Sequence, residues 1–356
     1  MSYQTVNVAL LGYGYSEKTF HCPLIAQVAG LRLTHIVSSD RKKVLTDWPD
    51  VTVLASAEEA FANPDVNLVV IATPNDTHFH LAARALSAGK SVVVDKPFTT
   101  TIAEASELAR MATNLGRMIS VFQNRRWDSD FLTVRHVLAE GRIGEVAHFE
   151  SHFDRYRPQV QARWRERRGQ GSGVWYDLGP HLVDQVLQIF GRPATIYADF
   201  EAQRKGAETV DYFHVIMRYG RTRVILHAAS FVAAKTARFT IHGHLGSFVK
   251  YGIDTQEDAL RRGQTPGTPS WGCDPELGSL VIPEHDSMRS TLVPNIPGNY
   301  LLYYEAIRDS ILRGAPNPVP PLEAVGVMTM LEVASESART GQELPLPHPT
   351  RHDTGA

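Results

Sequence analysis

One lysine follows an apolar run that predicts a buried strand. The valines at 92–94 are followed by Asp95, Lys96 and Pro97. Three β-branched residues in succession are typical of a central parallel strand, and Pro97 ends it because proline has no N–H to donate. We therefore expect Lys96 just outside the carboxyl end of this strand, where open α/β sheets bind ligands. Its ammonium group can hold a reacting oxygen or exchange a proton with it; the alternative is an exposed loop lysine paired with Asp95.

A second pair of candidate groups lies at the start of a predicted helix over residues 177–190. Asp177 and His181 are spaced i, i+4, which places both side chains on one helix face. An imidazole can accept and donate a proton near neutral pH, and a carboxylate can orient it or bind a hydroxyl group. The alternative is a helix-capping Asp177 beside a half-buried His181. Alongside Lys96 in one fold, the pair favours proton transfer.

The elements that must position these groups form two sets. Residues 1–123 alternate strands (6–11, 31–37, 68–72, 92–94, 118–122) with helices, which predicts βαβ units and a parallel sheet. Residues 124–356 carry strands at 146–155, 196–203, 211–219, 223–230 and 237–242, joined by short turns, which predicts an α+β domain with a large, mostly antiparallel open sheet. We expect a long loop over 261–298, and closing helices over 300–313 and 323–339 that can pack back on the first domain.

Composition excludes several classes of protein. The 356 residues carry a net charge of -2 with dispersed cations, which argues against a nucleic-acid partner. Two cysteines exclude a disulfide framework, and we find neither a signal-peptide pattern nor a membrane-spanning run, so we expect a cytoplasmic protein with no membrane partner. His242 and His244 share one strand face but lack a third ligand nearby, so we expect no metal.

A glycine turn after the first strand predicts a dinucleotide site. Gly12-x-Gly14 lies between a strand and a helix, where backbone N–H groups and the helix N-terminus face a pyrophosphate. The third position of the pattern is Glu17 in place of glycine. We expect the helix to sit further from the strand and the Glu17 carboxylate to point away from the phosphates; the alternative is a plain turn.

Two further strand ends complete the predicted cofactor edge. The second strand ends in Ser38 and Ser39, and Arg41 follows, which suits the 2′-phosphate of NADP; Asp40 in the ribose position would instead select NAD. We expect NADP, with NAD possible. The third strand ends in Thr73-Pro74-Asn75 with His78 beyond it, on the nicotinamide side. The alternative for Asn75 and His78 is helix capping and surface exposure.

Taken together, these motifs resemble the Gfo/Idh/MocA family of NAD(P)-dependent oxidoreductases. The resemblance rests on Gly12-Tyr13-Gly14, Thr73-Pro74-Asn75-x-x-His78, Asp95-Lys96-Pro97 and Asp177-x-x-Pro-His181, in family order over nearly the whole chain. Stretches 124–131, 155–158, 163–165, 210–214 and 250–252 are most similar to the NADP-dependent scyllo-inositol dehydrogenases of this family. Asp95 stands where the family usually has Glu.

The resemblance implies a Rossmann-fold N-terminal domain and assigns roles to residues. It makes Lys96 and His181 the proton-handling pair, with Asp177 beside them. The cofactor contacts it implies are Gly12, Tyr13, Gly14, Tyr15, Ser38, Ser39, Arg41, Thr73, Pro74, Asn75, His78, Asp95, Lys96, Pro97, Asn124 and Arg126. The substrate contacts we expect are Lys96, Asp154, Tyr156, Arg157, Trp164, Asp177 and His181, with Tyr300 and Tyr304 as further candidates.

The expected reaction is NADP-dependent hydride transfer between nicotinamide and a secondary alcohol of a cyclic polyol or sugar. Two alternatives remain: a non-catalytic NAD(P)-binding regulator, and an NAD-dependent glycosidase of the same fold. No helix is predicted over the outer face of the second sheet. We therefore expect a homodimer or homotetramer that forms through that face.

Overall fold

The computed structural model describes residues 5–347, which form two compact units. The first unit runs to Asn124 and includes Gln256–Trp271 and Asn299–Val325. The second unit holds Arg125–Thr255, Gly272–Gly298 and the described residues from Gly326 onward. We expected the two domains to be 1–123 and 124–356. The compact units are not continuous in sequence, because the later segments Gln256–Trp271 and Asn299–Val325 pack with the first part of the chain.

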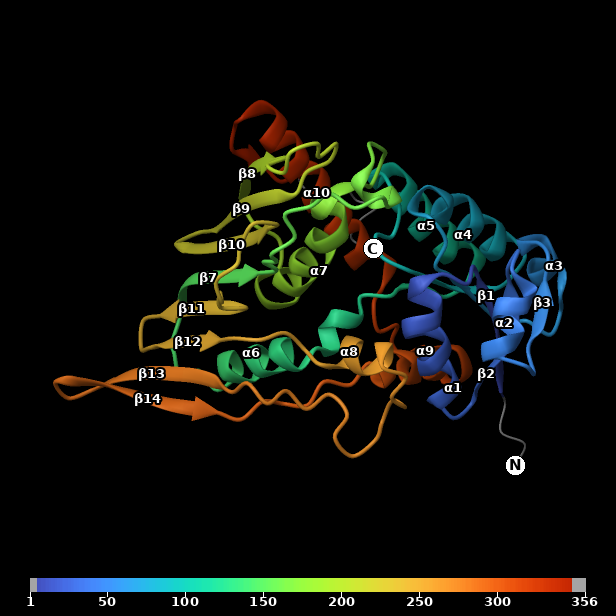
Figure 1. The fold of residues 1–356 in the computed structure, drawn as a ribbon, viewed down its shortest axis with the longest axis horizontal. Coiled ribbons are helices and arrows are strands. Elements are labelled where there is room, and N and C mark those ends of the chain that lie inside the picture. The colour runs from blue at the N-terminus through green and yellow to red at the C-terminus, as the bar shows by residue number, and fades with distance from the viewer. Residues whose placement is uncertain (1–4, 348–356) are drawn as a thin grey trace. The chain divides into compact units, whose positions relative to one another are not determined.

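A six-stranded parallel sheet forms the centre of the first unit (Figure 1). Its strand order is β3-β2-β1-β4-β5-β6. The order reverses between β1 and β4, and this switch point is where sheets of this kind bind ligands. β4 and β5 are buried along their whole length, as the apolar run of β4 and the three valines of β5 predict. The strands are β1 (Val6–Leu11), β2 (Leu31–Val37), β3 (Thr52–Leu54), β4 (Leu68–Ile71), β5 (Ser91–Val94) and β6 (Ile119–Val121).

Helices connect these parallel strands. The predicted helix after the glycine turn is split into a π-helical segment, η1 (Glu17–His21), and α1 (Cys22–Gln27). α5 (Ile102–Leu115) begins at a capping box of Thr101 and Glu104. The other helical segments of the unit are α2 (Arg41–Asp47), α3 (Ala57–Ala62), η2 (Asn75–Thr77), α4 (His78–Ser87), α8 (Gln256–Arg261) and α9 (Leu301–Arg313).

A nine-stranded sheet forms the second unit, in the order β14-β13-β12-β11-β7-β10-β9-β8-β15. It is mostly antiparallel, as predicted, but β7 and β10 pair in parallel. The expected loop over 261–298 is wrong in part, because residues 278–293 form the β13–β14 hairpin. The strands are β7 (Val146–His152), β8 (Thr195–Glu201), β9 (Tyr212–Tyr219), β10 (Thr222–Ala229), β11 (Phe239–Gly243), β12 (Ser247–Lys250), β13 (Gly278–Glu284), β14 (Ser287–Val293) and β15 (Leu344–Pro345).

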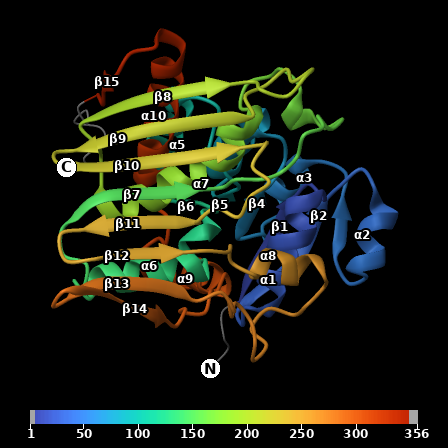
Figure 2. The ribbon, with the colours of Figure 1, turned by 60° about the vertical axis from the view of Figure 1, so that its left-hand side comes forward.

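The helices of the second unit lie on one face of this sheet (Figure 2). They are α6 (Ser129–Ala139), α7 (Gly173–Phe190) and the part of α10 (Pro321–Thr340) that belongs to this unit, with the short η3 (Asn124–Trp127) and η4 (Trp164–Glu166) beside them in sequence. Phe213, Val224 and Phe239 point to the helix side and are buried. Alternate residues of β9 and β10 are partly exposed on the opposite face, which no helix among the described residues of this unit covers.

Among residues 5–347, no helix combines the length and the hydropathy needed to cross a lipid bilayer.

Candidate active site

The glycine turn follows β1 and is hydrogen-bonded to the end of β2. Gly12 has a φ of +99°, which favours glycine, and its N–H donates to the Val37 carbonyl at 3.0 Å. A Cβ on Gly12 would lie 2.2 Å from a Glu17 side-chain oxygen. The backbone conformation therefore favours glycine at this position, and a larger residue would also have to push the Glu17 carboxylate aside.

Glu17 turns into the glycine turn, so the expectation that its carboxylate points away from the phosphate position is wrong. Its Oε2 accepts the Gly14 N–H at 2.9 Å, and the residue is only 4% exposed. The physical reason is that N–H groups at a helix start have no partner within the helix, and a carboxylate three residues on can accept one. Burial raises the pKa of Glu17. A pyrophosphate that binds this turn must displace the carboxylate from Gly14.

The end of β2 leads into the cap of α2. The Ser38 hydroxyl accepts the Asp40 N–H at 3.1 Å, and Asp40 accepts the Lys43 N–H at 2.9 Å. The Asp40 carboxylate is thus directed into its own helix. Lys43 Nζ donates to the Tyr13 carbonyl at 2.9 Å, and the Tyr13 hydroxyl donates to Asp47 at 2.8 Å. These bonds tie the glycine turn to α2.

The remaining candidates on this side are near the surface. Ser39 and Arg41 are exposed, and an Arg41 guanidinium nitrogen lies 3.3 Å from the Val53 carbonyl. Tyr15 is 55% exposed, and its hydroxyl donates to Glu257 at 2.9 Å.

Asp95 is held by groups from the segment after the glycine turn. Its carboxylate accepts the Ser16 hydroxyl at 2.5 Å and the Lys96 N–H at 2.7 Å. His21 Nε2 lies 3.7 Å from Asp95, and His21 Nδ1 lies 2.5 Å from the Tyr304 hydroxyl. Burial opposes ionisation of Asp95, but His21, Lys96 and Ser16 together hold the pKa of its carboxyl well below the usual range. The network fixes the loop that carries Lys96.

Ser16 and His21 were not predicted as site residues. The available signal was their position within ten residues of Gly12, in the helix that the dinucleotide pattern expects. Tyr304 was named only as a further candidate for the substrate, and in the structure it is fully buried against His21.

His78 links the ends of β4 and β5. Its two ring nitrogens each lie 2.9 Å from a carbonyl oxygen, one of Thr73 and one of Pro97. Burial lowers the pKa of this imidazole, and the alternative of surface exposure is wrong because His78 is only 1% exposed. The Lys96–Pro97 peptide bond is cis. Asn75 begins η2 and is also buried.

The structure thus brings most of the predicted cofactor residues to one edge of the parallel sheet. They follow the carboxyl ends of β2, β1, β4 and β5, which are neighbours in that order. Asn124 is buried at the end of the first unit. Arg126 belongs to the second unit, where its guanidinium binds Asp184 of α7 through two hydrogen bonds of 2.8 and 2.6 Å.

The two predicted acid–base groups of the second unit lie on α7. His181 is buried and Asp177 is half-buried, one helical turn before it. Pro180 lies between them inside the helix and removes one backbone N–H. Arg165 Nε lies 3.5 Å from the Asp177 carboxylate.

Asp177 lines a pocket rich in cationic side chains. Its charged lining residues are Arg155, Arg157, Arg163, Arg165, Arg204, Glu166 and Asp177. Arg204 is buried and already pairs with Asp211 at 2.8 Å and Glu166 at 3.2 Å. The other arginines leave an excess of positive charge next to Asp177.

Tyr156 and Asp154 are not among the described residues that line this pocket. Tyr156 is 62% exposed and pairs with Phe231 through an isolated bridge. Asp154 lies between two histidines on the open face of the sheet. Trp164 is in η4, and its side chain is outside the described residues. Tyr300 is fully buried, and its N–H donates to Gln256.

Together, the switch point of a parallel sheet, its glycine turn and a lysine at a neighbouring strand end define an oxidoreductase with a dinucleotide-binding Rossmann domain. Comparison with known families agrees. Residues 6–123 match the model described as "Oxidoreductase family, NAD-binding Rossmann fold", and residues 135–346 match the "Oxidoreductase family, C-terminal alpha/beta domain". The chain belongs to the Gfo/Idh/MocA family of oxidoreductases, as its motifs indicated.

Full-length relatives support this assignment. The uncharacterized oxidoreductase YdgJ of Escherichia coli (strain K12) is 52% identical, with 94% of this chain and 96% of YdgJ covered. The scyllo-inositol 2-dehydrogenase (NADP(+)) IolW of Bacillus subtilis (strain 168) is 42% identical over 97% of both chains. The solved structure of the YPO2259 protein from Yersinia pestis has a TM-score of 0.94 at 48% identity, with 98% and 99% of the two chains covered.

Proposed function

We propose that this oxidoreductase uses NADP to move a hydride between nicotinamide and a secondary alcohol of a cyclic polyol or sugar. The observation that carries the proposal is Lys96, which follows the end of β5 and is preceded by an Asp95 bound to Ser16 of the segment after the glycine turn, together with Asp177 and His181 on α7. The full-length relative IolW, which is a scyllo-inositol 2-dehydrogenase (NADP(+)), supports the substrate class.

We assign a separate role in this reaction to each residue of the site. NADP, when bound, accepts or supplies the hydride. The Lys96 ammonium group holds the reacting oxygen and lowers its affinity for the proton. His181 accepts the alcohol proton, or returns it to the carbonyl in reverse, and Asp177 orients the imidazole or binds a neighbouring hydroxyl. Arg157 is a further hydroxyl partner, because each buried hydroxyl left unpaired is costly.

The loop after β2 supports NADP over NAD. An acidic side chain at this strand end would bind the ribose hydroxyls of NAD. Asp40 instead caps α2 through the Lys43 N–H, while Ser38 and Ser39 follow the strand directly and Arg41 begins α2. The glycine turn and the strand ends suit a dinucleotide, provided that the Glu17 carboxylate leaves Gly14.

The test is a screen of the purified chain with NADP⁺ and NAD⁺ against inositols and aldoses, and with NADPH against their keto forms. We expect turnover of at least one cyclic polyol, with NADP preferred. NADPH binding without turnover of any compound would contradict the proposal and point to a regulator. A nucleotide that stays bound through purification, together with glycoside cleavage, would contradict it in favour of a glycosidase.

We also propose that the chain acts in the cytoplasm as a homodimer or homotetramer. The two cysteines are free thiols, and Cys22 is buried, which suits a reducing compartment. The open face of the nine-stranded sheet is the surface we assign to self-association.

A further inference from the structure

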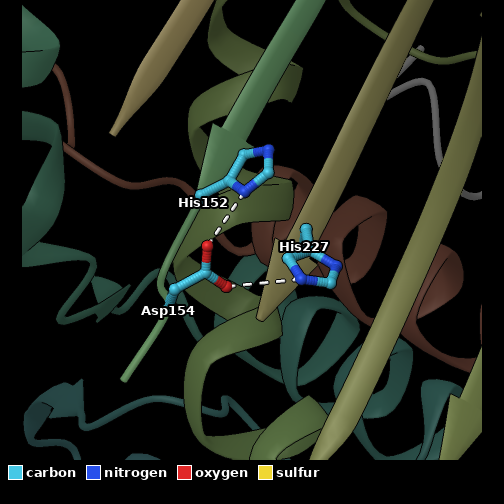
Figure 3. Close-up of side chains that lie close together, drawn as sticks. All are labelled: His152, Asp154 and His227. Atoms are coloured by element: carbon cyan, nitrogen blue, oxygen red, sulfur yellow. Dashed lines mark hydrogen bonds and ion pairs between the residues drawn. The ribbon is translucent and has the colours of Figure 1, made fainter. Parts of the chain in front are cut away.

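Three polar side chains meet on the open face of the nine-stranded sheet. His152 of β7 and His227 of β10 are direct partners in the parallel β7–β10 pair, so their side chains are neighbours on one face. Asp154 is two residues beyond His152 and returns to the same face. Figure 3 shows the Asp154 carboxylate between the two imidazole rings. Strand register alone therefore assembles a His-Asp-His cluster.

The distances within the cluster are close to those between the ligands of a tetrahedral metal ion. His152 Nδ1 lies 3.1 Å from one Asp154 oxygen, and His227 Nε2 lies 3.4 Å from the other. Bonds of 2.0–2.1 Å that meet at a tetrahedral angle separate two ligand atoms by about 3.3 Å. One donor atom from each of the three residues lies within 4.8 Å of the others. Because the two shorter distances end at different Asp154 oxygens, a turn of the carboxylate or a small shift of one ring would bring the three donor atoms onto a common cation.

The hydrogen bonding of the cluster is complete only when His152 carries a second ring proton or when a metal ion takes the place of that proton. His152 lies between two carboxylates, because its Nε2 is 3.0 Å from Glu150 while its Nδ1 faces Asp154. A neutral imidazole that donates from Nε2 presents the lone pair of Nδ1 to Asp154, and this contact requires a proton or a metal ion between the two atoms. The Asp154 side chain is only 4% exposed, and its Oδ1 accepts no hydrogen bond.

The charges around the cluster favour the binding of a divalent cation. Among the ion pairs of the described residues, those of Asp154 are with His152 and His227 only. The nearby cationic side chains already have other partners, because Lys235 pairs with Glu276 and Arg238 pairs with Asp130. Asp154 and Glu150 therefore place two negative charges beside three imidazoles, those of His152, His227 and His148, and neither carboxylate has an ion pair with a lysine or arginine among the described residues.

We propose that His152, Asp154 and His227 bind one divalent ion of the first transition row, and Zn²⁺ is the ion that we expect. Two imidazoles and one carboxylate are a ligand set of zinc, whereas Mg²⁺ and Ca²⁺ prefer oxygen ligands alone. Glu150 accepts a hydrogen bond from Nε2 of His152, as the outer carboxylate of a carboxylate–histidine–metal arrangement does. A cavity lined in part by His152, Asp154 and Thr236 leaves space for water as the fourth ligand.

This site differs from the pair of histidines that the sequence suggested and that we set aside. His242 Nδ1 lies 2.8 Å from the Ser247 hydroxyl, and His244 lies 3.8 Å from Glu145. The proposal also makes Asp154 a metal ligand in place of the expected contact with a substrate hydroxyl. The ion would join the chain just beyond β7 to β10 and so stabilise the centre of the sheet.

The test uses the full chain without an affinity tag, stripped of metal with a chelator that is then removed. We expect calorimetric titration with Zn²⁺ to give one ion per chain, and added Zn²⁺ to raise the Tm, because an ion that binds only the folded state stabilises it. Asp154→Asn and His227→Gln should remove both effects. Glu150→Gln should weaken binding by about 10–100-fold, the usual cost of losing an outer carboxylate.

A matched control is His242→Gln, a histidine on the same sheet face outside the cluster, which should bind Zn²⁺ as the wild type does. Co²⁺ as a second probe should give the intense visible absorption of a tetrahedral nitrogen–oxygen site in the wild-type chain, a result that needs no variant to fold. Equal Zn²⁺ binding by the wild type and both ligand variants would overturn the proposal. So would a weak, octahedral Co²⁺ spectrum, or a stoichiometry well below one.

Discussion

We expect Glu17 to determine how readily the glycine turn accepts a cofactor. Its carboxylate accepts the Gly14 N–H at 2.9 Å, a donor that we expect a bound pyrophosphate to use. Glu17→Gly removes both the competing acceptor and its negative charge, and we expect NADPH to bind about tenfold more tightly, which corresponds to about 1.4 kcal/mol. Fluorescence titration of NADPH measures the change. Glu17→Gln is the matched variant, because its amide oxygen can still accept from Gly14 without the charge, and its Kd should lie between the other two.

The same residue gives cofactor binding a pH dependence. Burial already raises the pKa of Glu17, and a bound pyrophosphate raises it further because the two anions repel each other. Binding therefore takes up a proton. NADPH affinity should be highest below the pKa of Glu17 in the free protein and should fall as the pH rises through it. Titrations at several pH values should show this decline in the wild type and a flatter curve in Glu17→Gln; superimposable curves would contradict the explanation.

Lys96 and His181 are the residues on which the proposed chemistry depends. Loss of a proton-transfer group costs about 10²–10⁴-fold in rate, so Lys96→Met and His181→Ala should each lower kcat within that range. In His181→Ala the Kd for NADPH should stay near the wild-type value, because that side chain belongs to the other compact unit. The exposed His80→Ala serves as control and should keep full activity. Near-normal kcat in both variants, with intact folds, would refute the assignment.

At the scale of elements, a buried ion pair fixes η3 to α7. Arg126 and Asp184 are both buried and share two short hydrogen bonds. Asp184→Ala leaves a buried guanidinium without this partner, and we expect unfolding in urea to show a loss of about 3–5 kcal/mol. The double variant Arg126→Met/Asp184→Leu should recover most of that loss, because apolar pairs of similar volume replace buried ion pairs well. A loss below about 1 kcal/mol in Asp184→Ala would show that the pair is not a major support.

The elements that the sequence predicted well are those whose signals are local. β5 and its exit to Lys96 follow from three valines and a proline, and the glycine turn follows from the spacing of Gly12 and Gly14. The direction of the Glu17 side chain was not predictable, because it depends on which unpaired N–H the carboxylate finds. Nor was the meeting of His152 with His227, because it depends on the register between strands far apart in sequence.

The β13–β14 hairpin was missed for a related reason. Its strands lie in a segment rich in Gly, Pro and Ser, and β14 is exposed along nearly all of its length. A strand at the edge of a sheet lacks the alternation of apolar and polar residues that marks a half-buried strand. Its partner β13 also pairs with β12. The hairpin therefore depends on hydrogen bonds to the rest of the sheet and not on a local sequence pattern.

For the whole molecule, we propose that the open face of the nine-stranded sheet determines the state of assembly. Tyr197 of β8, Ile216 of β9 and Ile225 of β10 are register partners across three strands and form an apolar row on that face. Tyr197 is 38% exposed, and the two isoleucines are partly exposed. Antiparallel sheets with one uncovered apolar face commonly bury it against a second copy. We expect sedimentation equilibrium at micromolar concentration to give a dimer or a tetramer.

A charged side chain in the centre of that apolar row should prevent self-association of the chain. Ile216→Glu places a carboxylate where the proposed interface excludes water, and burying it unpaired costs more than the apolar contact contributes. The variant should sediment as a smaller species with its circular dichroism unchanged. Asn114→Glu, an exposed position on α5, adds the same charge away from the sheet and should leave the assembly intact. A monomeric wild type at this concentration would contradict the assignment, as would an Ile216→Glu chain that assembles like the wild type.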